Sequence, residues 1–390
     1  MSGSGAGARQ LVFLSHATDR SGPPVYLLHL LRWLADHTDR RLDVLSLCGG
    51  DLAPEVAEVA GLQVVHEPNP VRLPRGSRHA TRARDLLRAS RVKGVDRDAL
   101  VHVNTAWSVR ALRYLPWHRG PVVAHVHELE VGLDYHLPSA DRALLFSRTD
   151  HWVAASQAVA DNLTHRWGVA PEEIHVHHEM IDTAAPARVD PAQVRSLRHG
   201  IGLGPGATLV GTTAVLNWRK APDLFVELAA RVVRRHPDID PHFAWVGVDD
   251  RSPEVAALRR DARRAGIADR LHLVAVSARP EAWMRAFDVF VLPAREDAFP
   301  LAALEAAAAG RPVVCFAAGG MPEFVRTDAG AVVDFPDVAA MSREVAELSV
   351  DPARRREAGR AAQRRVVRDH DVAVAAPRLW SDLDRWSSER

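Results

Sequence analysis

Short runs of apolar residues recur along the whole chain, separated by longer stretches with a helical pattern. The runs are continuous rather than alternating, which is typical of parallel strands buried on both faces. One intervening stretch, residues 25–36, places Leu27 and Leu31 on the same face of a helix. Strands are predicted at residues 10–15, 42–47, 62–66, 100–103, 121–126, 151–155, 208–215, 243–246, 271–276, 289–292, 312–316 and 332–335. This alternation of strands and helices predicts an α/β fold built from doubly wound sheets.

A stretch rich in Pro, Ala and Gly, residues 182–206, divides the strand pattern into two halves. Its composition is typical of a linker, and 390 residues suit two domains of ordinary size. We therefore expect a first domain at residues 1–183 and a second at residues 184–368. Residues 369–390 are expected to form a final helix.

The composition is that of an ordinary globular protein, with 47% hydrophobic and 25% charged residues and a net charge of +1. A balanced charge gives no general attraction to nucleic acid. Neither a transmembrane segment nor a signal peptide is predicted. The only cysteines, Cys48 and Cys315, lie in apolar contexts, so we expect buried, reduced thiols and a cytoplasmic protein.

The most basic segment runs from Arg72 to Lys93 and contains one acid, Asp85. A solvated loop and helix is the interpretation that its composition favours. An anionic acceptor is a second interpretation, and a peripheral contact with the inner membrane face is a third. Only Leu86 and Leu87 are available to insert into lipid, so the membrane contact would be weak.

The most informative stretch is residues 288–325, which predicts strand, acidic loop, helix, strand, glycine turn and helix. In open parallel sheets, the loops that follow the strands line the ligand crevice. The acidic loop carries Glu296 and Asp297, and the glycine turn is Gly319-Gly320. Glu305 lies in an alanine-rich helix without a polar face, so its carboxylate needs a partner, for which ligand hydroxyls are one candidate.

A cationic pair, Arg219 and Lys220, precedes the helix expected to end at Arg235. Two cations beside the free N–H groups of a helix start form an anion site. Lys93 and Lys220 are the only lysines in the chain, which weakly suggests that a compact point charge is needed at Lys220.

Four motifs now coincide: Glu296-Asp297-Ala298-Phe299-Pro300, Glu305, Gly310-Arg311-Pro312-Val313-Val314 and Gly319-Gly320-Met321-Pro322-Glu323. Together they resemble the donor-site signature of the retaining GT-B glycosyltransferases of family 4. The family spacing back from Glu305 falls on Asp297, with Glu296 beside it, so either residue can take the first acidic role. Elsewhere Ala221 replaces a glycine that usually follows the lysine.

The resemblance implies two Rossmann-like domains that face each other across a cleft, with a C-terminal helix that crosses back onto the first. It also implies the site. Donor-binding residues would be Gly22, Arg219, Lys220, Ser277, Phe299, Pro300, Glu305, Gly319 and Gly320. Acceptor-binding residues would be Ser21, Asn104, Thr105, His127 and Glu128. Catalytic residues would be His127, Arg219, Lys220, Glu296 and Asp297.

The implied reaction moves a sugar from a nucleoside diphosphate sugar, with UDP or GDP the expected nucleotide, to a small-molecule, glycan or lipid-linked acceptor. Glu305 would bind the ribose, and Asp297 or Glu296 the sugar ring. Arg219, Lys220 and the amides of Gly319-Gly320 would stabilise the leaving diphosphate. No cofactor is expected.

Metal-binding patterns are incomplete in the sequence. Asp238-Ile-Asp240 lies between a helix and a strand start, where no sugar-nucleotide metal would bind. His125 and His127 share a strand face but lack further ligands at later strand ends, and the cluster His175 to His178 has no assigned role. Two alternatives stay open: a nucleotide-sugar epimerase or hydrolase on the same fold, and a GT-B binding module without catalysis.

Overall fold

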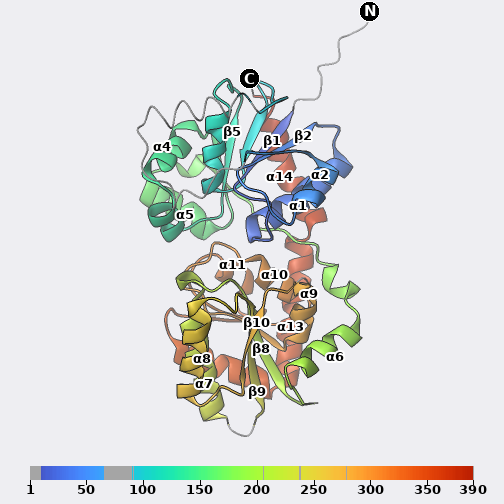
Figure 1. Ribbon diagram of the computed structural model, residues 1–390, viewed down its shortest axis with the longest axis vertical. Helices are drawn as coiled ribbons and strands as arrows, with labels where there is room; N and C mark the ends of the chain where they lie inside the picture. The colour runs from blue at the N-terminus through green and yellow to red at the C-terminus, as the bar shows by residue number, and fades with distance from the viewer. Residues whose placement is uncertain are drawn as a thin grey trace, which may run out of the picture. The chain divides into compact units, whose positions relative to one another are not determined.

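The computed structural model describes residues 10–65, 90, 92–204, 206–236, 239–277 and 279–389. The chain divides into two compact units (Figure 1). The first comprises Met1–Met180 with Val372–Arg390, and the second comprises Ile181–Asp371. The segment from Arg72 to Arg91 lies outside the described residues except for Ser90. Asp238 also lies outside them.

The described residues of the first unit form a seven-stranded parallel sheet with the order β3-β2-β1-β4-β5-β6-β7. Its strands are β1 (Leu11–Ser15), β2 (Leu42–Ser46), β3 (Gly61–Val64), β4 (Leu100–Val103), β5 (Val122–Val126), β6 (His151–Ala154) and β7 (Ile174–Val176). The α-helices are α1 (Gly22–His37), α2 (Ala53–Val59), α4 (Ser139–Arg148), α5 (Gln157–Trp167) and α14 (Val372–Trp386). Shorter helical turns are η2 (Ala106–Tyr114), η3 (Gly132–His136) and η4 (Pro171–Glu173).

The second unit contains a six-stranded parallel sheet with the order β10-β9-β8-β11-β12-β13. Its strands are β8 (Thr208–Thr213), β9 (Pro241–Val248), β10 (Leu271–Ala275), β11 (Val289–Leu292), β12 (Val313–Phe316) and β13 (Gly330–Val333). Its α-helices are α6 (Pro191–Gly200), α7 (Pro222–Arg235), α8 (Pro253–Ala265), α9 (Pro280–Ala286), α10 (Leu301–Ala308), α11 (Met321–Val325), α12 (Val338–Val350) and α13 (Pro352–Asp369). Two 3₁₀ turns are η5 (Ala185–Arg188) and η6 (Trp218–Lys220).

Both faces of the second sheet carry an apolar core, as the continuous apolar strands predict. On one face, Phe290 and Val313 pack with residues of α9, α10 and α13. On the other, Val289 and Val314 pack with residues of α7, α8 and α12. Figure 1 shows α7 and α8 on one side of this sheet and α9 and α13 on the other. Successive side chains of one strand thus serve opposite cores.

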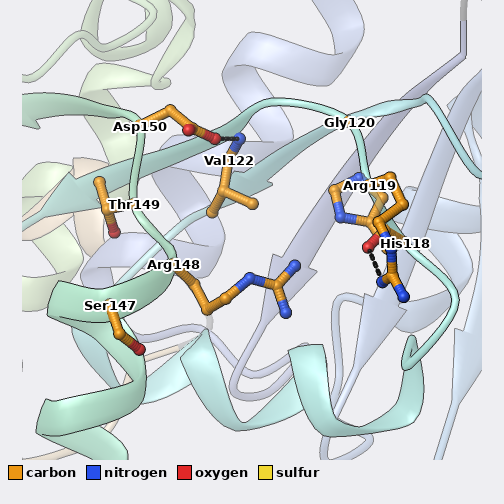
Figure 2. A pocket seen from close by; sticks show the side chains of 8 residues that line it. All are labelled: His118, Arg119, Gly120, Val122, Ser147, Arg148, Thr149 and Asp150. Atoms are coloured by element: carbon orange, nitrogen blue, oxygen red, sulfur yellow. Dashed lines mark hydrogen bonds between the residues drawn. The ribbon is translucent and has the colours of Figure 1, made fainter.

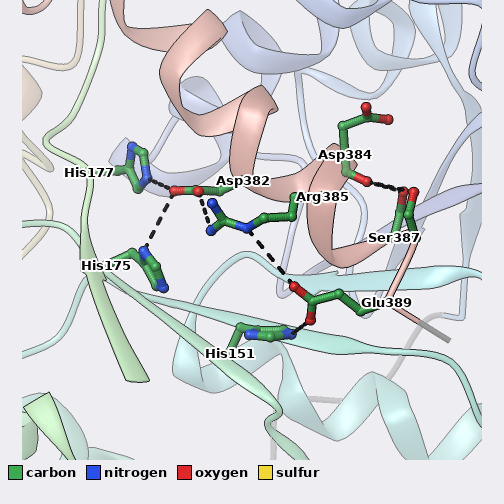
Figure 3. Close-up of polar contacts among 9 residues, drawn as sticks. His151, His175, His177, Asp382, Asp384, Arg385, Ser387 and Glu389 are labelled. Atoms are coloured by element: carbon green, nitrogen blue, oxygen red, sulfur yellow. Dashed lines mark hydrogen bonds and ion pairs between the residues drawn. The ribbon is translucent and has the colours of Figure 1, made fainter. Parts of the chain in front are cut away.

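The C-terminal helix α14 belongs to the first unit, where it packs beside α1 (Figure 1). Leu379, Leu383 and Trp386 are buried on its inner face. On the β6–β7 side, Asp382 accepts a hydrogen bond from His177 at 2.8 Å (Figure 3). The ring of His151 stacks on that of Trp386. Apolar burial and polar contacts together hold this helix to the sheet.

The structure departs from the sequence-based expectations at several points. Residues 182–206, expected to be a linker, lie within the second unit, where Arg198 in α6 donates to the carbonyl of Ala286 at 2.6 Å. The first helix begins at Gly22 instead of Val25, because prolines are well accommodated in the first turn of a helix. Strand β7 was not predicted. Cys48 is partly exposed, so the expectation that both thiols are buried holds only for Cys315.

Candidate active site

The order of the second sheet reverses between β8 and β11, so the loops after these two strands meet at its switch point. Ligands bind at such points in open α/β sheets. Arg295, in the loop after β11, joins the two loops because its N–H donates to the carbonyl of Arg219 at 2.7 Å. Its guanidinium forms a bidentate pair with Asp223 at 2.6 and 2.9 Å and lies over the ring of Trp218. The predicted cationic and acidic loops are thus one connected structure.

The cationic loop presents Lys220 directly to the acidic loop. The side chain of Asn217 accepts from the N–H of Lys220 at 3.0 Å and so caps the turn η6. The Lys220 ammonium forms an ion pair with Asp297, and both side chains are largely buried. The guanidinium of Arg219 makes no hydrogen bond or ion pair with any residue that the structure describes. One cation of the pair is therefore internally neutralised, and the other is available.

The glycine turn supports the acidic loop from beneath. Gly319 has a φ of +92°, and a Cβ at this position would lie 1.8 Å from the carbonyl oxygen of Asp297. The N–H of Gly320 donates to that same oxygen at 3.1 Å. The Gly320 amide thus holds Asp297 in place, and contact of Gly319 and Gly320 with a diphosphate stays a prediction.

Glu305 lies in α10 between Leu304 and Ala306 of the apolar core and is itself partly exposed. Burial, together with the negative charge of Glu281, raises the pKa of its carboxyl to about 7. In the part of the chain that the structure describes, its carboxylate has no hydrogen-bond or ion-pair partner. The described residues thus do not supply the partner that the Glu305 carboxylate was expected to need. A ligand hydroxyl remains a candidate for that partner.

The remaining donor-site predictions fall at several places in the second unit. Phe299 is buried, with its ring stacked on that of His370 at 5.3 Å, so the ring belongs to the core. Pro300 is the N-cap of α10, and Glu296 is partly exposed beside Asp297. Ser277 follows β10, and its Oγ accepts from the N–H of Arg279 at 3.1 Å.

In the first unit, the loop after β1 leads to an open helix start. Ser21 is the N-cap of α1, and its hydroxyl donates to Asp19 at 2.5 Å. Gly22 begins the helix and is exposed, and a Cβ added there would meet no protein atom within 4 Å. The protein itself therefore leaves this position free for close approach by another molecule.

Three predicted acceptor-binding side chains are engaged within the first unit instead. Asn104 is buried, and its amide donates to the carbonyl of Pro23 at 2.9 Å. The hydroxyl of Thr105 accepts from the N–H of Ser108 and caps η2. Glu128 accepts from the N–H groups of Ala106 and His127. These side chains fix loop geometry after β4 and β5, and their assignment as acceptor-binding residues stays a prediction.

His127 forms the most buried ion pair at this edge of the first sheet. Its Nδ1 lies 2.5 Å from Oε1 of Glu179, and each side chain is 6% exposed. Burial alone would lower the pKa of the imidazole, but the charge and hydrogen bond of Glu179 outweigh it, so the pKa of His127 is raised. Its Nε2 is buried and has no hydrogen-bond partner among the described residues.

Two further histidines beside it are neutral core residues. His102 in β4 and His125 in β5 are completely buried, and burial lowers the pKa of both, that of His102 to about 3. The rings of His125 and His127 lie 4.1 Å apart. Among the described residues, no group of three or more His, Cys, Asp or Glu side chains is arranged to hold a metal ion.

A separate polar pocket of about 340 Å³ lies at the opposite edge of the first sheet, where β5 and β6 begin (Figure 2). Its lining includes His118, Arg119, Arg148 and Asp150. The guanidinium of Arg119 donates hydrogen bonds to the nearby carbonyls of Pro116 and His118. None of the residues predicted for the site lines this pocket.

Sequence reasoning did not identify Arg295, Asp223 or Glu179 as part of these arrangements. For Arg295 and Asp223 no signal existed, because they lie 72 residues apart and pair only in the folded chain. For Glu179 there was none, because its partner lies 52 residues away.

Two protein-family models match the chain. The model for Glycosyltransferase Family 4 matches residues 20–185, and the model for Glycosyl transferases group 1 matches residues 207–351. No helix among the described residues is long and apolar enough to cross a membrane.

The similar curated proteins are bacterial glycosyltransferases. D-inositol 3-phosphate glycosyltransferase 1 of Catenulispora acidiphila is 28% identical over 359 residues, covering 86% of this chain and 84% of that protein. The D-inositol 3-phosphate glycosyltransferase of Salinispora tropica is 29% identical over 377 residues, covering 89% of this chain and 77% of that protein.

Solved structures match over nearly the whole chain. Anabaena Alr3699/HepE in complex with UDP and glucose has a TM-score of 0.79 at 19% identity, covering 97% of this chain and 100% of that one. Sucrose-phosphate synthase from Thermosynechococcus elongatus has a TM-score of 0.75 at 18% identity, covering 97% and 99%. With the two parallel sheets, these matches confirm the predicted GT-B fold.

Proposed function

The chain belongs to the family 4 and group 1 glycosyltransferases, and from this premise we propose that it moves a sugar from a nucleoside diphosphate sugar to an acceptor hydroxyl. Anomeric configuration is retained and no metal ion takes part. The second unit binds the donor, and the first unit supplies the acceptor-binding residues. UDP and GDP are the nucleotides to test first.

The observation that carries this proposal is the arrangement of Arg219, Lys220 and Asp297 at the switch point of the second sheet. Breaking the glycosidic C–O bond places negative charge on the departing diphosphate. Fixed cations in a site with little water stabilise such charge strongly. Arg219 is available for this task at once, and Lys220 becomes available when a phosphate displaces Asp297. Asp297 can then accept from hydroxyls of the sugar.

Glu305 is assigned to the nucleoside. Burial raises the pKa of its carboxyl to about 7, and no described residue forms a hydrogen bond or ion pair with it. The ionised form therefore gains most from a ligand with two adjacent hydroxyls. A ribose supplies that pair. Retention of configuration is proposed from the likeness to family 4, with front-side displacement as the route.

For the acceptor, the names of the relatives suggest a phosphorylated polyol, since several act on D-inositol 3-phosphate. We propose this class for the present chain as well. A phosphate on the acceptor would add a second anion, and the basic segment from Arg72 to Lys93 is where the sequence offers cations for it.

The deciding experiment measures nucleoside diphosphate release from UDP- and GDP-sugars, with inositol 3-phosphate, unphosphorylated inositol or no acceptor, each with and without EDTA. Release that requires the phosphorylated acceptor and survives EDTA supports the proposal, and NMR of the product assigns the anomer. Release without acceptor would indicate a hydrolase. Conversion of the donor into its epimer would indicate an epimerase, and nucleotide binding without turnover would indicate a binding module.

A further inference from the structure

Two side chains from separate strand ends meet at the carboxyl edge of the first sheet. His127 follows β5 directly, and Glu179 lies shortly after β7, so the intervening β6 separates the two strands. The His127 Nδ1 and the Glu179 Oε1 are 2.5 Å apart, and both side chains are almost fully buried. A buried charged group is retained only when it is paired, so each residue depends on the other for its charge.

The pairing also settles the orientation of the imidazole. With Nδ1–H donated to the carboxylate, Nε2 is left as the functional end of the ring. Nε2 is buried and makes no hydrogen bond with a described residue, although the backbone of Asn104 also helps to raise the pKa of the ring. An imidazolium held in this way keeps a second donor, Nε2–H, for a stronger acceptor.

The groups around His127 do not compete for this role. His102 on β4, His125 on β5 and His16 after β1 all have a lowered pKa caused first by burial, so they are neutral. Tyr26 on α1 packs edge-on against the His127 ring, and burial raises its pKa well above the ordinary value. Glu128 is a second acid whose charge raises the pKa of His127, and its carboxylate accepts from the N–H groups of Ala106 and His127.

We propose that Glu179 is the positioning residue of the active site: it orients His127 and holds it as an imidazolium whose Nε2–H binds an oxygen of the bound substrate. The inference rests on the proposed function, because a substrate oxygen is the acceptor that Nε2–H needs.

The test compares Glu179→Gln with Glu173→Gln, a matched change at an exposed acid of η4. A nearby carboxylate raises the pKa of a histidine by about 1–3 units, so Glu179→Gln should lower the pKa of His127 by that amount. Histidine ring NMR on the full chain, with His127→Gln used to assign the signal, measures this shift without turnover. Glu173→Gln should leave the signal unchanged.

Turnover provides the second measurement. Activity that requires the imidazolium is lost as pH rises through its pKa, so the basic limb of kcat/KM should move to lower pH in Glu179→Gln. The loss should be about 10-fold or more at pH 8 and smaller at pH 6. Glu179→Asp, which keeps the charge, should recover part of the activity at pH 8.

Two results would overturn the proposal. One is a His127 signal in the wild-type protein that titrates at or below the ordinary histidine value. The other is an equal loss of kcat/KM at every pH in a folded Glu179→Gln, which a purely structural pair would produce. If Glu179→Gln does not fold, the wild-type titration still decides. Absence of any sugar transfer by the wild type refutes the proposed function instead, and the NMR result then shows only whether the dyad is charged.

Discussion

Lys220 and Asp297 neutralise each other in the absence of ligand, and this single pair has consequences for donor binding. A diphosphate can replace Asp297 as the partner of Lys220 without leaving the ammonium unpaired. The carboxylate that is released then needs donors of its own, and sugar hydroxyls are suitable. Binding of the donor is thereby coupled to correct placement of both the phosphate and the sugar.

The first prediction concerns this cation. Lys220→Ala should lower kcat by about 10²–10³-fold, because one preorganised electrostatic contact to the leaving group is lost. Nucleoside diphosphate binding, measured by calorimetry, should weaken as well. Arg231→Ala, an exposed change on α7 that removes only a pair with Glu227, is the control. A Lys220→Ala variant with full kcat would contradict the assignment.

The second prediction concerns Glu305, whose folded-state pKa of about 7 lies above the ordinary glutamate value of 4.5. The folded protein therefore binds more protons than the unfolded chain between these values, and stability falls as pH rises through that range. Glu305→Gln removes this titration. Its melting temperature should exceed that of the wild type at pH 8 and match it near pH 4.5, while donor affinity falls.

Equal melting temperatures of wild type and Glu305→Gln at pH 8 would show that burial does not penalise the ionised carboxylate. Unchanged affinity for nucleoside diphosphate sugars would separately remove Glu305 from the donor site. The two measurements thus test the electrostatics and the assignment independently.

At the residue scale, the sequence predicts the types of the chemical groups but not their partners. An acid in an apolar helix and a cationic pair before a helix are local patterns, so Glu305 and Lys220 could be found from the sequence. The contact between Lys220 and Asp297 spans 77 residues, and that between His127 and Glu179 spans 52. Side chains such as Asn104 and Glu128 were assigned to a ligand because their bonds to backbone groups form only in the folded chain.

At the element scale, the glycine turn after β12 provides the third prediction. In Gly319→Ala, a residue with a Cβ must adopt the left-handed φ of Gly319. The new Cβ would also lie against the carbonyl oxygen of Asp297. Such strain costs about 1–3 kcal/mol before any clash is counted, so the variant should melt lower and lose donor affinity. Gly22→Ala is the matched comparison, since its Cβ meets no protein atom.

Gly22→Ala should keep the wild-type melting temperature. If substrate approaches the loop after β1 closely, kcat/KM of Gly22→Ala should nevertheless fall. Thermal melts and kinetics on both variants separate loss of stability from loss of substrate contact. A Gly319→Ala variant as stable as Gly22→Ala would disprove the bracing role of the turn.

Long or strongly patterned elements were predicted well, and short ones were not. The run Val289 to Leu292 was recognised as a buried strand because its side chains are all apolar. Strand β7 has only three residues, of which one is a histidine, so no periodic signal marks it. Its parallel pairing with β6, including Val153 with His175, supplies the stabilisation that its sequence lacks.

At the scale of the whole molecule, both sheets repeat one plan. Each begins at a central strand, winds to one edge and returns through a crossover to build the other half, as in the classical nucleotide-binding order. This plan was predictable, because unbroken apolar strands separated by helices allow few other arrangements. Residues 182–206 have the composition of a linker but pack within the second unit.

The last prediction follows from the return of the chain to the first unit. Leu379 in α14 is 1% exposed and its neighbour Arg378 is exposed, so the two form a matched pair. Leu379→Ala should destabilise the first unit by about 2–5 kcal/mol through lost burial and the cavity left behind, and Arg378→Ala should change little.

Hydrogen exchange followed by mass spectrometry measures the protection of backbone amides in the two units separately. Peptides from α1, β6 and β7 should lose protection in Leu379→Ala, whereas peptides from β8 to β13 should keep it. Equal loss in both units would mean that they unfold as one cooperative body, and no loss in either would mean that α14 does not stabilise the first unit.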